Sequence, residues 1–469
     1  MSNKTSIFLP GIAVYLLALI STSCLLYRYA LSPLWLVWGA ATVISFFLLC
    51  YYLNQHLSDN ESRVFVKKIF WIALGIRAVY ATAMVYYYYY QNGIAFEYDA
   101  GDSLRYHYQA AYLANLARHG EISEIFRLLK QSTMGFSDQG YVLYLTFLYS
   151  IFGKNLLIPR LLKALMSAFT CVAIYKLAQR NTDEKTAKTA AIMAVLMPQL
   201  IHYTGVNLKE TEMVFLATMA LERTDYLFKS KRFSFWNIFL PIVLTALTFG
   251  FRTIVGMLLI GSYLVYVIVD NSNRFNKKQK WGIAGGIVAL IIVLALTPIG
   301  KEMITIFKVN FRESHYQVEK YEALGMKYAE YAQTKYLLPG CFTLPLTNLV
   351  DVANNNQKLM NGTYFVKNYL AFFAMWCLVI AIRKKSWREF SLIGTYTLAY
   401  ILLIAFSFAA NSERYHLPAI PGFLIMASYA MTHWEKKDRI YFYLYNVLLV
   451  IAIVVWNVVK VEARGLPVF

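Results

Sequence analysis

The chain of 469 residues is 58% hydrophobic and only 15% charged, and its formal net charge is +19. Soluble domains are about a quarter charged, whereas long apolar runs recur here from end to end. The composition therefore excludes a large soluble protein and predicts an all-α polytopic membrane protein. The basic residues cluster in short loops between the apolar runs, which is a topology signal and argues against a nucleic-acid partner.

We expect thirteen membrane-spanning helices, arranged as a single transmembrane domain over residues 1–469. The expected spans are 6–27, 31–53, 68–92, 157–179, 186–206, 209–228, 233–251, 253–270, 280–299, 363–383, 387–409, 416–434 and 439–459. The apolar segment 140–153 is short, and it is either a further span or a segment lying at the interface. All six basic loops fall on one side of the membrane if 140–153 does not cross, so we expect that side, and the N-terminus, to be cytoplasmic.

This topology puts two long loops on the outer side, 93–156 and 300–362. The first contains the stretch "FEYDAGDSLRYHYQAAYLANLARHG", directly after a hydrophobic run that ends in five tyrosines. Apolar residues at helical spacing predict an amphipathic helix from Asp102 to Arg118 that lies on the outer interface. Asp102 is either only the N-cap of this helix or a residue that also faces a site. Asp99 and His107 are weaker candidates, as a loop residue and an interfacial polar contact.

Other charged residues stand at outer span ends, although they are far apart in the sequence. They are Lys209 and Glu210 in "HYTGVNLKETEM", Arg252 in "FGFRTIVG", and Arg414 and Tyr415 in "NSERYHLP". Ionisable groups at membrane depth are costly and tend to be functional. Two arginines beside one or two carboxylates suit an anionic, lipid-linked phosphate, which arginine can hold bidentately. A carboxylate there could take the proton of a nucleophile.

At these residues the chain resembles the GT-C superfamily of integral-membrane glycosyltransferases. The nearest resemblance is to bacterial dolichyl-phosphate-mannose-protein mannosyltransferase-like and aminoarabinose-transferase-like members. "DSLRYHYQAA" is similar to the acidic motif that these enzymes carry in the first long outer loop, and it assigns the acidic role to Asp102. "GFSDQGYVLYLTFLYSIFGKNLLIPRLL" resembles a family segment followed by an arginine, here Arg160. "MPQLIHYTGVNLKETEMVFL" and "ERYHLPAIPGFLIMASY" resemble two later segments, whereas a Lys-Pro-Pro type motif of several members is missing.

The resemblance implies a GT-C-type bundle with amphipathic juxtamembrane helices in both long outer loops. It also implies transfer of a sugar, with inversion, from a polyprenyl-phosphate donor to a glycan, lipid or protein acceptor on the outer face. Asp102 would be the general base. Arg252, Arg414 and Lys209 would bind the donor phosphate. The substrate-orienting residues would be Glu210, Asp99, Tyr106, His107, Tyr415 and Arg160. The location implied is the bacterial inner membrane, with the active site facing the periplasm.

The sequence has no dense set of histidine and cysteine ligands, so we expect no cofactor and no required metal. A divalent cation held by Asp99 and Asp102 is the open alternative. The loop 300–362 is expected to cover the site as a lid. Its segment "FRESHYQVEKYEALGMKYAEYA" is typical of an amphipathic helix, whose tyrosines line either a substrate groove or an interfacial aromatic belt.

Two other functions remain open at this point. A polymerase or ligase of lipid-linked glycans, of the O-antigen type, would use the same outer arginines without needing Asp102 as a base. A transporter of lipids or sugars predicts charged residues at mid-membrane on discontinuous helices. Most charges here stand at span ends, which favours an enzyme at the interface.

Overall fold

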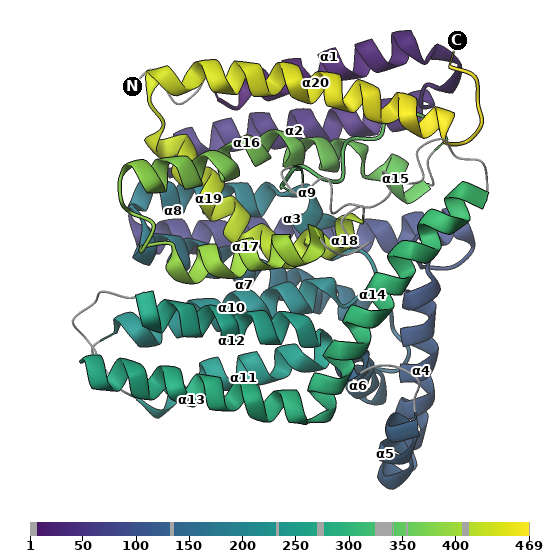
Figure 1. Ribbon diagram of the computed structural model, residues 1–469. Helices are drawn as coiled ribbons and strands as arrows, with labels where there is room; N and C mark the ends of the chain where they lie inside the picture. Colours follow the sequence, from purple (N-terminus) through teal and green to yellow (C-terminus); the bar gives the residue numbers. More distant parts are fainter. Residues whose placement is uncertain are drawn as a thin grey trace.

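The computed structural model describes residues 7–131, 136–230, 234–269, 276–323, 340, 342–352, 355–405 and 412–468 (Figure 1). In these residues the secondary structure is helical, apart from one isolated bridge between Ala30 and Val350. This agrees with the all-α fold class expected from the composition. The helices are α1 (Leu9–Leu25), α2 (Pro33–Leu57), α3 (Ser62–Asn92), α4 (Gly101–Arg118), α5 (Ile122–Gln131), α6 (Phe136–Phe152), α7 (Leu157–Asn181), α8 (Glu184–Leu196), α9 (Pro198–His202), α10 (Glu210–Lys229), α11 (Phe235–Phe251), α12 (Thr253–Val269), α13 (Lys277–Leu296), α14 (Pro298–Ala323), α15 (Asn355–Leu359), α16 (Asn361–Arg383), α17 (Ser391–Ala405), α18 (Glu413–His416), α19 (Ile420–His433) and α20 (Arg439–Glu462).

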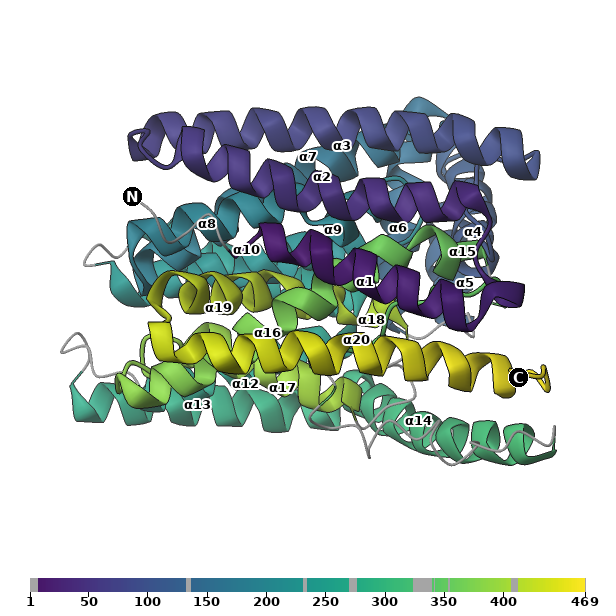
Figure 2. The same cartoon turned by 90° about the horizontal axis from the view of Figure 1, so that it is seen from above.

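Every expected span overlaps a helix of the described chain. Among the described residues, six helical segments are long and apolar enough to cross a membrane by length and composition: α2, α3, α7, α13, α16 and the segment Lys436–Glu462. Helices α1, α11, α12 and α17 are apolar but shorter. The chain is thus an integral membrane protein, and its apolar helices run along a common direction in Figure 2.

The expected span 186–206 is not one continuous helix. Helix α8 ends at Leu196 and α9 begins at Pro198, because proline has no N–H to donate and its ring clashes with the preceding turn. The break leaves carbonyl groups at the end of α8 without helical partners. The buried Arg77 of α3 donates to two of them, the oxygens of Ala194 and Val195, each at 2.9 Å. Arg77 therefore stabilises a broken helix inside the bundle.

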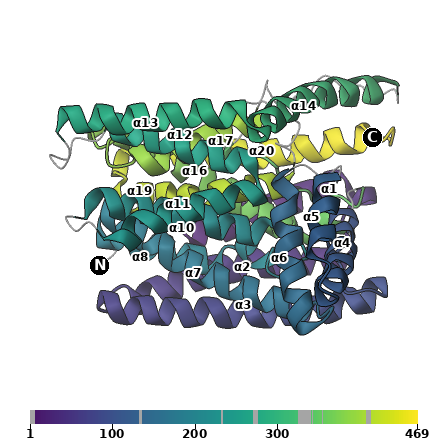
Figure 3. The same ribbon diagram turned by 90° about the horizontal axis from the view of Figure 1, so that it is seen from below.

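Helix α4 lies across one end of the bundle, next to α5 (Figures 1 and 3). Its side chains Tyr106, Ala110 and Leu113 are buried, as the helical spacing predicts. The N-cap expectation for Asp102 was wrong. The helix begins at Gly101 with Ala100 as its N-cap, so Asp102 lies in the first turn.

Helix α6, which contains the short apolar segment 140–153, packs along α4. Near its start, Asp138 accepts hydrogen bonds from Arg105 and Tyr106 of α4. Near its end, the carbonyl oxygen of Ser150 accepts a bond of 3.2 Å from Arg118, the last residue of α4. Both ends of α6 are therefore held at the end of the bundle where α4 lies.

The second long outer loop begins with α14, which continues from α13 at the same end of the bundle (Figure 1). The expected amphipathic helix is described as far as Ala323. Tyr316 on it is exposed, whereas Tyr328 and Tyr331 lie outside the described residues. The part of the proposed lid from 324 to 339 likewise lies outside them.

Candidate active site

Arg414 joins three distant segments of the chain at the end of the bundle where α4 lies. Its Nη1 atom lies 2.6 Å from Oδ2 of Asp102, and its Nε donates to the carboxylate of Glu210. Glu210 is fully buried at the first position of α10, where the helix dipole favours a negative charge. The Asp102 side chain, in contrast, is 41% exposed. One arginine thus holds a buried acid and an accessible acid together.

A second ion pair lies beside the first. Lys209 pairs with Asp138 and also donates to the carbonyl oxygen of Ser137 at 2.7 Å. The Tyr106 hydroxyl donates to Asp138 at 3.1 Å, and Arg105 lies 3.3 Å from the same carboxylate. Burial acts to raise the pKa of Asp138. The charge of Lys209 and the hydrogen bonds from Lys209 and Tyr106 outweigh it, so the pKa is lowered. Asp138 is therefore held as an anion.

Arg252 lies between α11 and α12. It is the C-cap of α11, and the next residue is the first of α12. Its guanidinium carbon lies 4.6 Å from the ring centroid of Tyr415, and that of Arg414 lies 5.8 Å from the same ring. Tyr400 and Glu210 are further electrostatic neighbours of Arg252. Among the residues that the structure describes, no carboxylate lies within ion-pair distance of Arg252.

A close contact between two glycines brings these segments together. A Cβ atom added at Gly140 of α6 would lie 2.4 Å from the carbonyl oxygen of Gly250 of α11. Only a residue without a side chain fits such an approach. Because Asp138 is two residues before Gly140 and Arg252 two residues after Gly250, this contact places the two charged residues in one neighbourhood.

These residues form what we call the outer charge cluster. It contains four cations and three carboxylates: Arg105, Lys209, Arg252 and Arg414 with Asp102, Asp138 and Glu210. Arg252 is a cation of the cluster without a carboxylate at ion-pair distance among the described residues, so the cluster can accept an additional anion there. An exposed carboxylate beside such an anion-binding group can accept a proton from an incoming hydroxyl.

Three of the expected site residues lie away from the cluster. Asp99 is exposed and adopts a left-handed backbone with φ of 56°. His107 contacts the Tyr149 hydroxyl at 3.0 Å, in the packing between α4 and α6. Arg160 is buried and donates to the carbonyl oxygen of Ala95 at 2.5 Å. Their orienting role remains a prediction that no contact with the cluster supports.

The structure also adds residues to which the sequence gave no role. Asp138 stands in the quoted segment "GFSDQG", as an acidic residue just before an apolar run. Glu97 accepts hydrogen bonds from Ser103 and from the backbone N–H of Asn207, and so ties the first turn of α4 to the segment before α10. An acid within the loop 93–156 was the available signal, but Asn207, which Glu97 joins to α4, lies 110 positions further along the chain.

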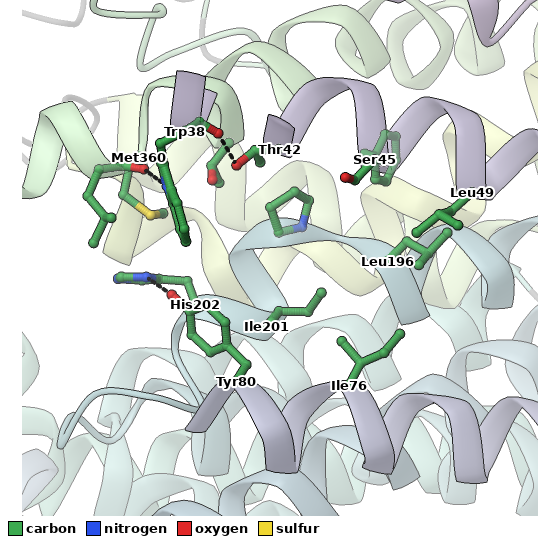
Figure 4. Close-up of a pocket in the computed structure, with 14 residues that line it drawn as sticks. Trp38, Thr42, Ser45, Leu49, Ile76, Tyr80, Leu196, Ile201, His202 and Met360 are labelled. Carbon is green, nitrogen blue, oxygen red and sulfur yellow. Dashed lines mark hydrogen bonds between the residues drawn. The ribbon is translucent and has the colours of Figure 1, made fainter. Parts of the chain in front are cut away.

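A separate cavity of about 290 Å³ lies between α2, α3, α9 and α16. Figure 4 shows its walls, which include Trp38, Thr42, Ser45, Leu49, Ile76, Tyr80 and His202. Two of the lining residues, Tyr80 and His202, are joined by a hydrogen bond of 3.0 Å. None of the residues of the outer charge cluster lines it. This cavity is therefore distinct from the candidate active site.

Comparisons with known proteins found similarity to a protein family and to a solved structure. Residues 141–297 match the family model described as dolichyl-phosphate-mannose-protein mannosyltransferase. The matched segment contains Arg160, Lys209, Glu210 and Arg252, and it leaves Asp102 and Arg414 outside. No curated protein matches the chain in sequence.

Among solved structures, the chain is similar to an Archaeoglobus fulgidus oligosaccharyltransferase tethered with an acceptor peptide. The identity is 14% and the TM-score 0.38, over 71% of this chain and 47% of that one. The chain thus spans about half the length of that enzyme. The family match is confined to residues 141–297, so it relates this part of the chain to these mannosyltransferases.

Proposed function

We propose that the protein moves a sugar from a polyprenyl-phosphate donor to a glycan, lipid or protein acceptor at the outer face of a bacterial inner membrane. The observation that carries this proposal is Arg252. It is a cation at an outer span end beside Lys209 and Arg414, and it has no carboxylate partner among the described residues. A donor phosphate supplies the anion that this arrangement lacks.

The phosphate is bound by Arg252, Arg414 and Lys209. All three side chains already belong to the cluster, so few side chains have to become ordered when the donor binds. In the reaction the bond between the anomeric carbon and the phosphate oxygen breaks, and negative charge develops on the departing phosphate. Fixed cations aimed at that charge stabilise the transition state, because they need no reorganisation when it forms.

Asp102 is the general base in this proposal. The acceptor hydroxyl oxygen attacks the anomeric carbon with inversion, and its proton passes to the Asp102 carboxylate. Arg414 contacts that carboxylate at 2.6 Å, and a bound phosphate competes for the same guanidinium. Donor binding thereby loosens Asp102 and couples its release to the presence of the substrate. Glu210 keeps Arg414 in place during this exchange, and Tyr106 and Tyr415 border the reacting groups.

The lipid chain of the donor is assigned to an apolar cavity of about 420 Å³ among α10, α11, α12 and α13. Phe249 and Ala246 of α11 line it, and Arg252 follows directly after the end of the same helix. A phosphate at Arg252 therefore leaves its chain next to this cavity. Its lining is almost entirely apolar, which suits an isoprenoid chain.

The topology in this proposal has 140–153 on the outer side without crossing. The contacts at both ends of α6 with α4 support it, because α4 lies across the end of the bundle. The loops 93–156 and 300–362 then both face the periplasm.

Binding of a polyprenyl phosphate to the purified protein tests the proposal. The full chain in detergent is titrated with a polyprenyl phosphate, the product of the proposed reaction, and with the matching uncharged polyprenol. We expect the phosphate to raise the melting midpoint and the polyprenol to have a much smaller effect. Equal effects of the two lipids would contradict a site built for the phosphate.

A further inference from the structure

Glu302 of α14 connects the second outer loop with two segments of the outer charge cluster. Its Oε1 accepts a hydrogen bond of 3.2 Å from the backbone N–H of Ser137. Its Oε2 accepts a hydrogen bond of 2.9 Å from the hydroxyl of Thr253. The half-buried carboxylate therefore bridges α6 and α12 with one bond from each oxygen.

Both partners are direct neighbours of cluster residues. Ser137 precedes Asp138, and its carbonyl oxygen already accepts a hydrogen bond from Lys209. The peptide groups on both sides of Ser137 are thus fixed, one by Glu302 and one by Lys209. Thr253 follows Arg252 at the first position of α12. A shift of Glu302 would therefore also move the backbone of the neighbouring residues Asp138 and Arg252.

The location of Glu302 also has an electrostatic reason. Ser137 lies in the first turn of α6 and Thr253 in the first turn of α12. The first N–H groups of a helix have no helical acceptors, and the positive end of the helix dipole favours a carboxylate there. The carboxylate of Glu302 therefore accepts from a backbone N–H in the first turn of α6 and from a hydroxyl in the first turn of α12.

We propose that Glu302 is a positioning residue, which sets the spacing of Arg252 and the Lys209–Asp138 pair for the donor phosphate. This inference rests on the proposed function. It assigns to the second outer loop a fixed contact that shapes the phosphate site, in addition to any role as a cover. A carboxylate that only fastened α14 to the bundle would affect stability and leave phosphate binding unchanged.

The test compares Glu302→Gln with Lys301→Gln, which removes a charge from the exposed neighbouring residue on the same helix. A glutamine has one acceptor oxygen and a donating NH₂ group, so it can accept from only one of the two donors. We expect Glu302→Gln to bind a polyprenyl phosphate about tenfold more weakly, in line with the loss of a charge-assisted hydrogen bond. The Lys301→Gln variant is expected to bind as the wild type does.

Thr253 provides an independent check. Thr253→Val removes the hydrogen bond from the Thr253 hydroxyl to Glu302 and is expected to weaken phosphate binding. Thr253→Ser keeps the hydroxyl and is expected to bind the phosphate as the wild type does. In a double-mutant cycle, Glu302→Gln and Arg252→Lys are expected to be non-additive, because Glu302 acts through Arg252.

The outcomes separate this inference from the function on which it rests. A Glu302→Gln protein that melts earlier but binds the phosphate as tightly as the wild type overturns the positioning role alone. Additive effects in the cycle with Arg252→Lys overturn it as well. A wild-type protein that fails to bind the phosphate overturns the proposed function and, with it, this inference.

Discussion

Arg414 and Asp102 lie 312 positions apart in the chain, and their side chains meet at 2.6 Å. The contact joins the first outer loop to the segment before α19, and Glu210 of α10 completes it from a third direction. Since Glu210 is buried and Asp102 is accessible, the two acids are suited to different tasks. Glu210 fixes the arginine, and Asp102 can exchange its contact with the arginine for a contact with substrate.

Replacing Asp102 by asparagine is expected to reduce sugar transfer by about 100-fold or more, the range typical of a missing general base. The amide keeps the size of the side chain, so the purified protein should retain its melting midpoint. Transfer is measured in cells or membranes as modification of the envelope glycan or lipid.

Glu121→Gln is the matched control, because Glu121 is an exposed acid in the same loop. It is expected to leave transfer nearly unchanged. A folded Asp102→Asn protein with full transfer would remove the general-base assignment and favour a polymerase or ligase that uses only the arginines.

Replacing Arg252 by glutamine is expected to weaken binding of a polyprenyl phosphate by roughly 10- to 100-fold, the equivalent of about 1.5–3 kcal/mol for a hydrogen bond to a charged group. The melting midpoint should change little, because no described carboxylate loses an ion pair. The affinity is measured by titration in detergent. Unchanged affinity would show that Arg252 does not contact the phosphate.

Replacing Arg414 by glutamine should have a different result, because it leaves the buried Glu210 without its partner. Removing one member of a buried ion pair typically costs about 3–5 kcal/mol. We expect a clear drop in the melting midpoint. The double variant Arg414→Gln with Glu210→Gln should recover most of it, since the buried side chain at position 210 then carries no unpaired charge. A double variant that melts as early as the single one would contradict this explanation.

The apolar spans could be predicted from the sequence because each one is a long local pattern. Even there, the break at Pro198 was missed, since the hydrophobic run continues through it and only the missing N–H interrupts the helix. The start of α4 was misplaced by one residue, which was enough to turn Asp102 from an expected N-cap into a residue of the first turn.

The composition of the charge cluster could be predicted only in part. Lys209, Glu210, Arg252 and Arg414 were recognisable because each is a charge at the end of an apolar run. Asp138 and Glu302 were not, since their roles depend on packing between α4, α6, α12 and α14. His107 and Arg160 illustrate the opposite difficulty, because they lie in helix packing away from the cluster and their orienting role stays a prediction. Local sequence cannot tell a polar group buried in helix packing from one that faces a site.

Filling the apolar cavity among α10 to α13 tests where the lipid chain lies. Ala246→Trp places a large side chain in that cavity, and we expect weaker binding of a long-chain polyprenyl phosphate. A short-chain isoprenyl phosphate, which contacts only the outer charge cluster, should bind the variant as it binds the wild type. Equal weakening for both lipids would indicate damage to the cluster, and no weakening would place the chain elsewhere.

Glu413 lies directly before Arg414. We expect it to make the folding stability fall as the pH rises, whereas an acid in a salt bridge makes the stability rise with pH. Burial raises the pKa of Glu413 to about 7, although the charge of Lys367 opposes this rise. Its carboxylate accepts a hydrogen bond from Gln199. In the unfolded chain a glutamate has a pKa of about 4.3.

Between about pH 4.3 and about pH 7, Glu413 has lost its proton in the unfolded chain but still holds it in the folded protein. The stability that comes from protonated Glu413 is therefore complete below about pH 4.3, falls as the pH rises, and is lost above about pH 7. Glu413→Gln mimics the protonated form at every pH. We expect it to melt later than the wild type at pH 8 and at a similar temperature at pH 5. Glu389→Gln, at an exposed acid, should leave the pH profile unchanged, and a Glu413→Gln profile that still declines between pH 5 and 7 would assign the dependence to another group.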